Sequence, residues 1–233
     1  MSAQPVRPPI VILGGFLSRP GLYRAMQRAL ADEAGVRVSV VNVGVLDWLP
    51  TVSTLGWRAI LRKLDRTVRD ALRESGRESV VLVGHSSGGV LGRLYLSPEP
   101  FEGDVFAGRD RVSRLLPLGS PNTNQRIGPI RRWVDQQYPG ACFAPDVSYT
   151  SVAGKLVEGR ARGGVGQRLA YHAYRQLCGE GAVWGDGLVP VTCALLAGAN
   201  AVVLDGVGHA PVLARRWFGS PDVVRQWWVG SAS

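Results

Sequence analysis

A serine within a glycine-rich run is the residue of this sequence best suited to covalent chemistry. The run Gly84-His85-Ser86-Ser87-Gly88-Gly89 follows the apolar stretch 79–83 and reads G-x-S-x-G around Ser86. Between a strand and a helix this pattern forms a strained turn that exposes the serine hydroxyl, and side chains at positions 84 and 88 would collide with the neighbouring strand and helix. The start of the helix directs N–H groups and a positive dipole end toward developing negative charge. The spacing therefore predicts Ser86 as a nucleophile.

A serine hydroxyl needs a general base, and the chain holds three histidines, His85, His172 and His209. His85 adjoins the serine inside the turn, so its side chain should point away from that of Ser86. His172 lies in a helical stretch before the last predicted strand. His209 lies in the glycine-rich loop 206–211, after the last predicted strand and before the last predicted helix. We therefore expect His209 to be the base.

The base needs a carboxylate that orients its ring and stabilises the imidazolium. Asp186, in the run 184–190 (WGDGLVP), falls between the serine and the histidine in the chain. This is the chain order Ser, Asp, His of one large class of serine hydrolases. Asp146 and Asp205 stay open as alternatives, although Asp205 comes only four residues before His209 and suits a loop-stabilising role better. Asp-Gly is also a common turn pair.

Two backbone donors should stabilise the oxyanion that forms when the serine attacks a carbonyl group. One is the N–H of Ser87, the residue after the nucleophile. The other is expected from the loop 14–17 after the first strand, at the N–H of Phe16, because its glycines permit unusual backbone conformations. We also expect Gly15, Leu17 and His85 to contact the substrate.

Short apolar runs alternate with helical patterns along the chain, which is typical of an α/β fold with a mostly parallel sheet. We expect about six strands and helices on both faces of the sheet, in one domain over residues 1–233. The predicted strands are 10–13, 36–43, 79–83, 112–118, 147–153 and 201–204, and the main predicted helices are 22–34, 53–75, 90–96 and 211–229. Two long irregular segments, 97–111 and 155–185, could cover a site.

Five motifs together resemble the α/β-hydrolase superfamily, in its lipase and esterase branch. They are Gly14-Gly15-Phe16, GHSSGG at 84–89, Leu118-Gly119-Ser120-Pro121-Asn122, WGDGLVP at 184–190 and GVGHAP at 206–211. The run Tyr149 to Pro211 is similar to lipase-like hydrolases of cyanobacteria and plant plastids. The resemblance extends from about Pro9 to Val229. This sequence departs from the commoner pattern at Ser87, where Met or Gln is more frequent.

The residues and the resemblance imply a serine hydrolase that cleaves carboxylic esters through an acyl-enzyme. Acyl thioesters are the alternative substrates, because the same triad serves both, and a non-catalytic binding protein is disfavoured by the presence of all three triad candidates. Apolar residues of the segments 97–111 and 125–145 would suit an acyl pocket, but they could equally belong to the core. They are Phe101, Val105, Phe106, Ile127, Ile130, Trp133, Tyr138 and Phe143. The expected substrate is a small-molecule or lipid acyl ester, and the reaction needs no metal and no organic cofactor.

The composition limits the partners of the protein. With 27 basic and 18 acidic residues the formal net charge is +9, but the arginines are scattered and form no dense basic tract, so nucleic acid is not an expected partner. A basic surface could instead make peripheral contact with an anionic membrane. Three cysteines without a CxxC pair indicate neither a disulfide framework nor a zinc site. The apolar run 10–13 is too short for a signal peptide or a membrane span, so a cytoplasmic location is the default expectation.

Overall fold

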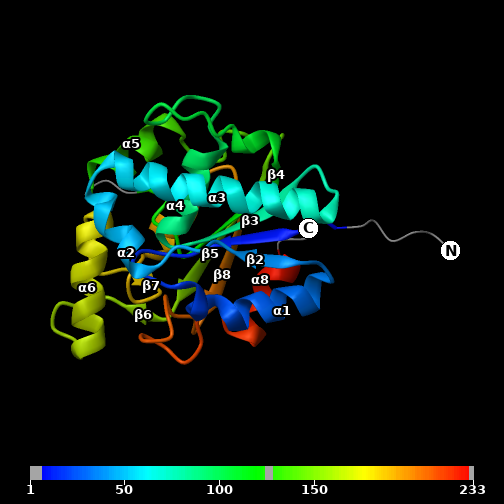
Figure 1. The fold of residues 1–233 in the computed structure, drawn as a ribbon. Helices are drawn as coiled ribbons and strands as arrows, with labels where there is room; N and C mark the ends of the chain where they lie inside the picture. The colour runs from blue at the N-terminus through cyan, green and yellow to red at the C-terminus, as the bar shows by residue number, and fades with distance from the viewer. Residues whose placement is uncertain (1–6, 124–127, 231–233) are drawn as a thin grey trace.

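A six-stranded sheet forms the centre of the computed structural model, which describes residues 7–123 and 128–230. The strand order is β2-β1-β3-β4-β5-β8, and every neighbouring pair is parallel (Figure 1). The strands are β1 (Ile10–Leu13), β2 (Val38–Val40), β3 (Val80–His85), β4 (Val112–Leu118), β5 (Ser148–Lys155) and β8 (Asn200–Asp205). This confirms the predicted parallel sheet of about six strands.

Helices cover both faces of this sheet, as parallel strands require. One face carries α1 (Arg24–Ala34) and α8 (Pro221–Gly230), and the other carries α3 (Thr54–Ser75), α4 (Ser87–Leu96) and α5 (Pro129–Gln137) (Figure 1). The carboxyl edge of the sheet carries α2 (Val45–Trp48), α6 (Val165–Cys178), α7 (Val191–Ala194) and a small antiparallel pair of β6 (Val157–Glu158) and β7 (Trp184–Gly185). Short 3₁₀ turns are η1 (Pro20–Tyr23), η2 (Leu49–Val52) and η3 (Gly108–Asp110).

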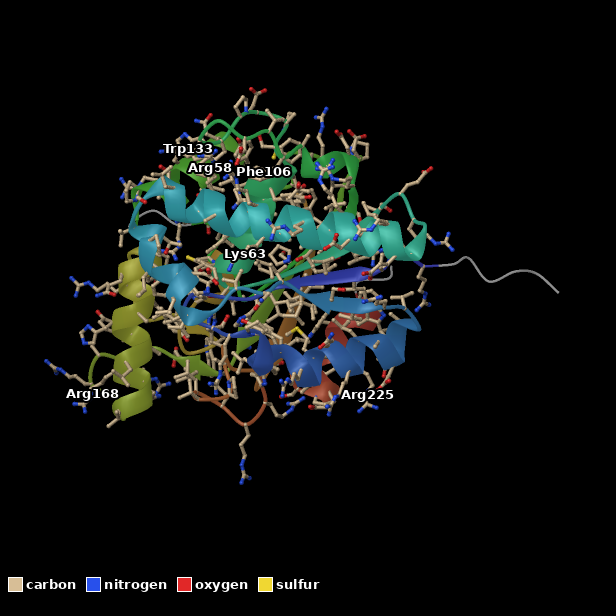
Figure 2. All side chains as sticks on the ribbon, in the orientation of Figure 1. Arg58, Lys63, Phe106, Trp133, Arg168 and Arg225 are labelled. Atoms are coloured by element: carbon tan, nitrogen blue, oxygen red, sulfur yellow. The ribbon has the colours of Figure 1, made fainter. Side chains whose placement is uncertain are left out.

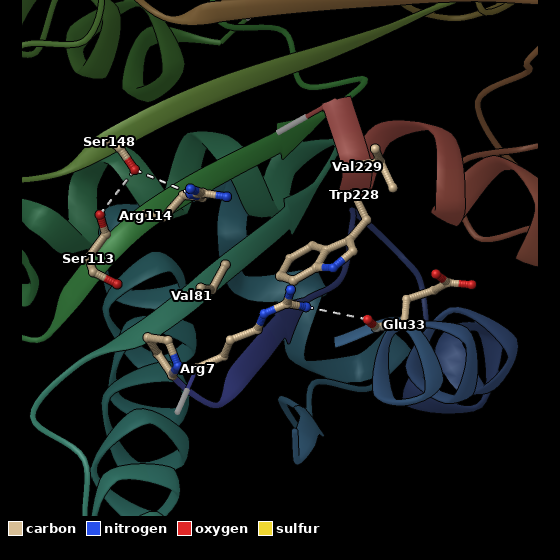
Figure 3. A pocket seen from close by; sticks show the side chains of 9 residues that line it. Arg7, Glu33, Val81, Ser113, Arg114, Ser148, Trp228 and Val229 are labelled. Carbon is tan, nitrogen blue, oxygen red and sulfur yellow. Dashed lines mark hydrogen bonds between the residues drawn. The ribbon is translucent and has the colours of Figure 1, made fainter. Parts of the chain in front are cut away.

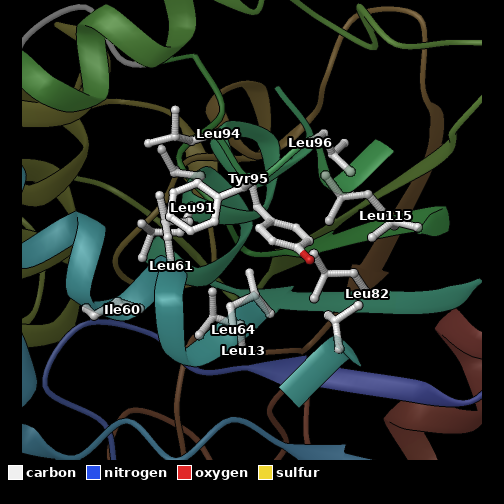
Figure 4. Close-up of a cluster of buried hydrophobic side chains, with 14 of the residues drawn as sticks. Leu13, Ile60, Leu61, Leu64, Leu82, Leu91, Leu94, Tyr95, Leu96 and Leu115 are labelled. Atoms are coloured by element: carbon white, nitrogen blue, oxygen red, sulfur yellow. The ribbon is translucent and has the colours of Figure 1, made fainter. Parts of the chain in front are cut away.

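The alternation of side chains along each strand divides the core into two layers. Ile10 and Ile12 of β1 pack with α1 and α8, whereas Val11 and Leu13 pack with α3 and α4. The apolar stripe predicted for α3 is buried on that second face, and Figure 4 shows it against α4 and the sheet. These layers hold β3 rigidly, and β3 carries the candidate nucleophile at its end.

Two segments differ from the prediction. The segment 155–185, expected to be irregular, contains the 14-residue helix α6, whose inward face buries Ala170, Tyr174 and Leu177 at helical spacing. Glycines and polar residues around this short apolar stripe obscure its period in the sequence. Residues 211–220, expected to be helical, form turns instead. The helix begins only at Pro221, because proline favours the first helical position and disfavours a helical residue before it.

No helix in the described ranges is long and apolar enough to cross a membrane.

Candidate active site

Ser86 lies in a sharp turn between β3 and α4. Its backbone has φ 53° and ψ −122°, a conformation that is strained for any residue other than glycine. Its N–H donates to the carbonyl oxygen of Leu118 on the next strand at 2.9 Å. A Cβ at Gly84 would lie 2.5 Å from Cα of Gly89, and one at Gly88 would run into the carbonyl oxygen of Leu13. The predicted need for glycine on both sides of the serine is therefore confirmed.

The structure brings Ser86, His209 and Asp186 together in one hydrogen-bonded chain. Nε2 of His209 lies 3.0 Å from Oγ of Ser86, and Nδ1 lies 2.7 Å from Oδ2 of Asp186. Because an ionised carboxylate only accepts hydrogen bonds, Nδ1 carries the ring proton and Nε2 is free to accept the serine proton. This is the tautomer that a general base needs.

The side chain of Asp186 is buried and hydrogen-bonded through both carboxylate oxygens. Its side chain is 1% exposed, and its Oδ1 accepts hydrogen bonds from the N–H groups of Leu188 and Val189 at 2.9 and 2.7 Å. Its carbonyl oxygen also accepts the N–H of His209 at 2.9 Å, so the two loops are joined through backbone as well as side chains. These contacts fix the carboxylate against the ring of His209.

The alternative triad residues lie elsewhere. Asp205 ends β8 on the surface, with Oδ1 3.5 Å from Nζ of Lys155, and Asp146 is exposed. His172 is exposed on α6, where its ring packs edge-on against Tyr171. The described structure thus places only the expected carboxylate, Asp186, against His209.

The two expected oxyanion donors lie at the ends of neighbouring strands. Ser87 is the first residue of α4, so its N–H has no acceptor within that helix. The loop after β1 comes alongside it, since a Cβ at Gly15 would lie only 2.9 Å from Cβ of Ser86. Phe16 and Leu17 follow in this loop, both exposed, and Leu17 has a φ of 58°. The loop therefore borders the nucleophile, as an oxyanion loop must.

His85 fits one of the two expectations for it and not the other. Its side chain points away from Ser86, as expected, but it is only 3% exposed and both ring nitrogens have partners within the protein. Nε2 lies 2.9 Å from the carbonyl oxygen of His209, and Nδ1 lies 2.9 Å from Oη of Tyr23. Burial, together with the nearby His209, lowers the pKa of His85 to about 3, so the ring is neutral. The expected substrate contact of His85 does not fit this arrangement.

Tyr23 completes a buried network that sequence reasoning missed. A carbonyl oxygen can only accept, so Nε2 of His85 is its protonated nitrogen and Nδ1 accepts from Oη of Tyr23. The same Oη accepts the N–H of Gly15 at 2.8 Å. The network therefore connects the loop after β1 to the backbone of His209. No motif surrounds Tyr23 in the sequence, and its only signal is that a buried tyrosine hydroxyl needs a partner.

A family model described as the alpha/beta hydrolase family matches residues 10–225. The chain belongs to the alpha/beta hydrolase family. No curated protein matches it. The narrower resemblance to cyanobacterial and plastid enzymes stays a prediction.

Two solved structures share the fold of this hydrolase over most of its length. A gene product of Listeria innocua is 15% identical with a TM-score of 0.56, covering 94% of this chain and 91% of its own. A candidate hydrolase of the alpha/beta superfamily from Xanthomonas campestris is 17% identical with a TM-score of 0.51, covering 94% and 99%. A candidate lipase from Acinetobacter baumannii AYE is 16% identical with a TM-score of 0.49, covering 96% and 82%. At identities of 15% and 17%, the likeness to the first two structures extends to the fold alone.

Arg131 is a second residue of the hydrolase that sequence reasoning missed. Its Nη2 donates to Oγ of Ser87 at 2.9 Å, and its guanidinium lies 5.9 Å from the centre of the Trp57 ring. No described carboxylate forms an ion pair with it, and residues 124–127 include neither Asp nor Glu. Burial lowers the pKa of Arg131, and its Nε has no acceptor among the described atoms. An uncompensated positive charge thus lies beside the residue whose N–H is an expected oxyanion donor.

An apolar hollow of about 530 Å³ lies between the start of α3, the loop 100–102 and α5. Of the residues expected to form an acyl pocket, Phe101, Ile130 and Trp133 line it. Phe106 and Tyr138 belong to the buried core instead, and Ile127 lies outside the described residues. Ile130 and Trp133 flank Arg131 on α5, so the hollow adjoins the helix that reaches Ser87.

A larger hollow of about 680 Å³ lies at the opposite, amino end of the strands (Figure 3). Arg7, Val81, Arg114 and Trp228 are among the residues that line it, and none of the triad residues does. In the described ranges no group of three or more His, Cys, Asp or Glu side chains is arranged to hold a metal ion.

Proposed function

We propose that this hydrolase cleaves carboxylic esters with apolar acyl groups through an acyl-enzyme formed on Ser86. The observation that carries the proposal is the continuous chain of contacts from Asp186 through His209 to Oγ of Ser86, at 2.7 and 3.0 Å. Nucleophile, base and orienting carboxylate lie in the order and at the distances that acyl transfer needs.

In the first half of the reaction, Oγ of Ser86 attacks the ester carbonyl carbon while its proton moves to Nε2 of His209. The carbonyl π electrons move to the carbonyl oxygen, and the N–H groups of Ser87 and Phe16 stabilise the resulting oxyanion. The tetrahedral intermediate collapses, the bond to the alcohol oxygen breaks, and this oxygen takes the proton from Nε2. The alcohol leaves, and the acyl group stays on Ser86.

In the second half, water attacks the acyl carbon and gives one proton to Nε2 of His209. Collapse of this second intermediate breaks the bond to Oγ of Ser86, which takes the proton back. The products are a carboxylic acid and the free enzyme. Asp186 stays ionised throughout, since its role is to hold the ring of His209 and to stabilise the imidazolium in each half-reaction.

The apolar character of the acyl group is supported by the surroundings of the serine. Phe16 and Leu17 are exposed beside it, and the hollow lined by Phe101, Ile130 and Trp133 adjoins α5. Each methylene group buried against such a surface contributes about 0.8 kcal/mol. Acyl thioesters would use the same groups, and they are the alternative that the experiment must separate.

The test is kcat/KM for p-nitrophenyl esters from acetate to palmitate, with acyl-CoA of matched chain lengths and with Ser86→Ala protein as the blank. We expect kcat/KM to rise with chain length until the apolar surface is filled. A maximum at acetate would contradict the apolar-acyl proposal. If acyl-CoA is turned over faster than every oxygen ester, the enzyme is a thioesterase and the proposed ester hydrolysis is wrong.

A further inference from the structure

Exposed apolar side chains concentrate at the edge of the sheet that carries Ser86. They lie in five segments, 16–17, 45–55, 165–169, 184–188 and 212–213, which we call the apolar rim. Leu46 is 77% exposed, Val52 93% and Val212 87%. Outside the rim, the described residues include four large apolar side chains that are exposed: Val105, Trp133, Val203 and Val229.

The topology explains why the rim and Ser86 lie at the same edge of the sheet. Segment 16–17 follows β1, segment 45–55 follows β2, and segment 212–213 follows β8, while Ser86 follows β3. The carboxyl ends of parallel strands meet at one edge of a sheet, so these segments share that edge. In Figure 1 the α2, α6 and β7 elements lie together at the left end of the sheet, opposite the N-terminus.

The rim is not part of the core. Helix α6 already buries Ala170, Tyr174 and Leu177 against the rest of the fold, while Val165 and Leu169 on its other side are about two-thirds exposed, at 66% and 65%. Large apolar side chains that stay exposed at one edge after the core is complete are characteristic of an interaction site.

Positive charge accompanies the rim on α6 and the loop before it. Residues 159–179 include Arg160, Arg162, Arg168 and Arg175 but neither Asp nor Glu. Arg160 pairs with Glu158, whereas no ion pair joins the other three arginines to a described carboxylate. Figure 2 shows Arg168 extending outward from α6. Such a surface is complementary to an anionic lipid membrane. The arginines can bind the anionic headgroups, and the aliphatic side chains can insert among the apolar chains below them.

Trp184 adds a further feature of this kind. Trp184 is 45% exposed, and the centre of its indole ring lies 5.3 Å from Nζ of Lys155. A tryptophan with an adjacent cation is favoured at the boundary between water and lipid. A second copy of this chain fits the rim less well, because the two copies would bring the same arginines against each other.

We propose that the apolar rim docks the hydrolase on an anionic lipid–water interface, with Ser86 facing the lipid. The docking proposal rests on the proposed function in one respect, that the ester substrate is taken from this interface. Acyl esters in the interface would lie with their chains next to the apolar rim. The docking itself does not need catalysis, so it can be measured on an inactive protein.

The experiment measures binding of full-length Ser86→Ala protein to phosphatidylcholine vesicles with and without phosphatidylglycerol, by co-sedimentation. We expect binding to the anionic vesicles that weakens as salt is added. Leu46→Ser combined with Leu169→Ser should weaken it about tenfold or more, because two apolar side chains no longer insert. Val105→Ser, an exposed apolar residue away from the rim, is the matched control and should change nothing.

Charge is tested separately. Arg168→Gln should weaken binding to anionic vesicles by about fivefold and leave the residual binding to neutral vesicles unchanged. Arg225→Gln, on α8 at the opposite side of Figure 2 from α6, serves as the control.

The proposal fails if the Ser86→Ala protein binds neither kind of vesicle, or if the rim variants bind as well as their controls. It also fails if the rim variants instead convert a dimer to a monomer, since the rim would then be an interface between copies. Vesicle binding without any ester hydrolysis by the wild type would leave the docking surface standing and overturn the proposed function.

Discussion

The ring of His85 donates a hydrogen bond from Nε2 to the main-chain carbonyl oxygen of His209, across 2.9 Å. The residue before Ser86 thereby holds the loop that carries His209, although the two histidines are 124 residues apart in the chain. Through Tyr23 the same ring reaches the N–H of Gly15 in the loop after β1. One buried network thus joins the loops that carry the proposed nucleophile, base and oxyanion donor.

The first prediction concerns this network. His85→Leu removes the donor and leaves a buried carbonyl oxygen unsatisfied, at a cost of about 1–3 kcal/mol. We expect kcat to fall roughly tenfold to a hundredfold with little change in KM, because His209 is less well positioned. His85→Gln should recover most of the loss, since its amide can donate to the same oxygen. Equal activity of His85→Leu and wild type would show that the network does not position the base.

The second prediction uses the low pKa of His85. Its pKa is lowered from 6.5 to about 3 in the folded protein, so between these values the unfolded chain binds a proton that the folded chain does not. Stability is therefore lost as the pH falls below 6.5, by about 1.4 kcal/mol per pH unit from this residue. Urea unfolding at pH 6.5 and pH 5 should show roughly 2 kcal/mol more loss in the wild type than in His85→Gln. Identical losses in the two proteins would exclude a buried neutral His85.

The third prediction separates the carboxylates. Asp186→Asn should lower kcat by roughly 10³- to 10⁴-fold, because the asparagine favours the wrong tautomer of His209 and cannot stabilise its imidazolium. Asp205→Asn, at an exposed position beside Lys155, should leave kcat within about twofold of the wild type, as surface changes do. A large loss of kcat in Asp205→Asn together with a small loss in Asp186→Asn would show that Asp186 is not the carboxylate that supports His209.

The fourth prediction concerns Arg131. Its charge lies beside Ser87 without a described carboxylate partner, so Arg131→Met should slow ester hydrolysis by roughly tenfold through weaker stabilisation of the oxyanion. The same change should not lower the melting temperature, because no buried carboxylate is left unpaired. Arg132→Met, the exposed neighbour, is the control for activity.

Arg93 gives the matching control for stability. This buried arginine donates to the buried carbonyl oxygens of Asn122 and Tyr138 and lies 3.4 Å from the partly exposed carboxylate of Asp135. Arg93→Met leaves both carbonyl oxygens unsatisfied, at about 1–3 kcal/mol each, so we expect a loss of about 2–6 kcal/mol in the free energy of unfolding, measured by urea denaturation. If Arg131→Met destabilises the protein as much as Arg93→Met does, Arg131 is a structural residue.

The sequence predicts those parts of the site that follow from a short motif or from the order of residues along the chain. Ser86 is recognisable because the turn between β3 and α4 requires glycines at 84 and 88, and Asp186 and His209 follow from chain order and loop context. Tyr23 and the role of His85 could not be predicted, because their hydrogen bonds join residues far apart in the chain and depend on how three loops pack. Arg131 stands next to another arginine, Arg132, so in the sequence it looks like part of a solvated face.

The fold shows the same division. The apolar runs and the long stripe of α3 predict the central sheet and its covering layers, since burial dictates their period. Helix α6 was missed because its buried stripe consists of Ala170, Tyr174 and Leu177 among polar residues and glycines. The apolar rim could not be predicted either, because exposed and buried leucines look alike until the neighbouring elements are in place.

Labelling with a fluorophosphonate probe, followed by mass spectrometry of the modified peptide, tests the central claim most directly. An activated serine hydroxyl attacks the probe's phosphorus, forms a covalent adduct and expels fluoride, whereas ordinary serines do not react. We predict one adduct, on Ser86, which disappears in Ser86→Ala and is strongly reduced in His209→Ala, while Ser87→Ala is still labelled. An adduct that persists on another serine in the Ser86→Ala protein would contradict the account.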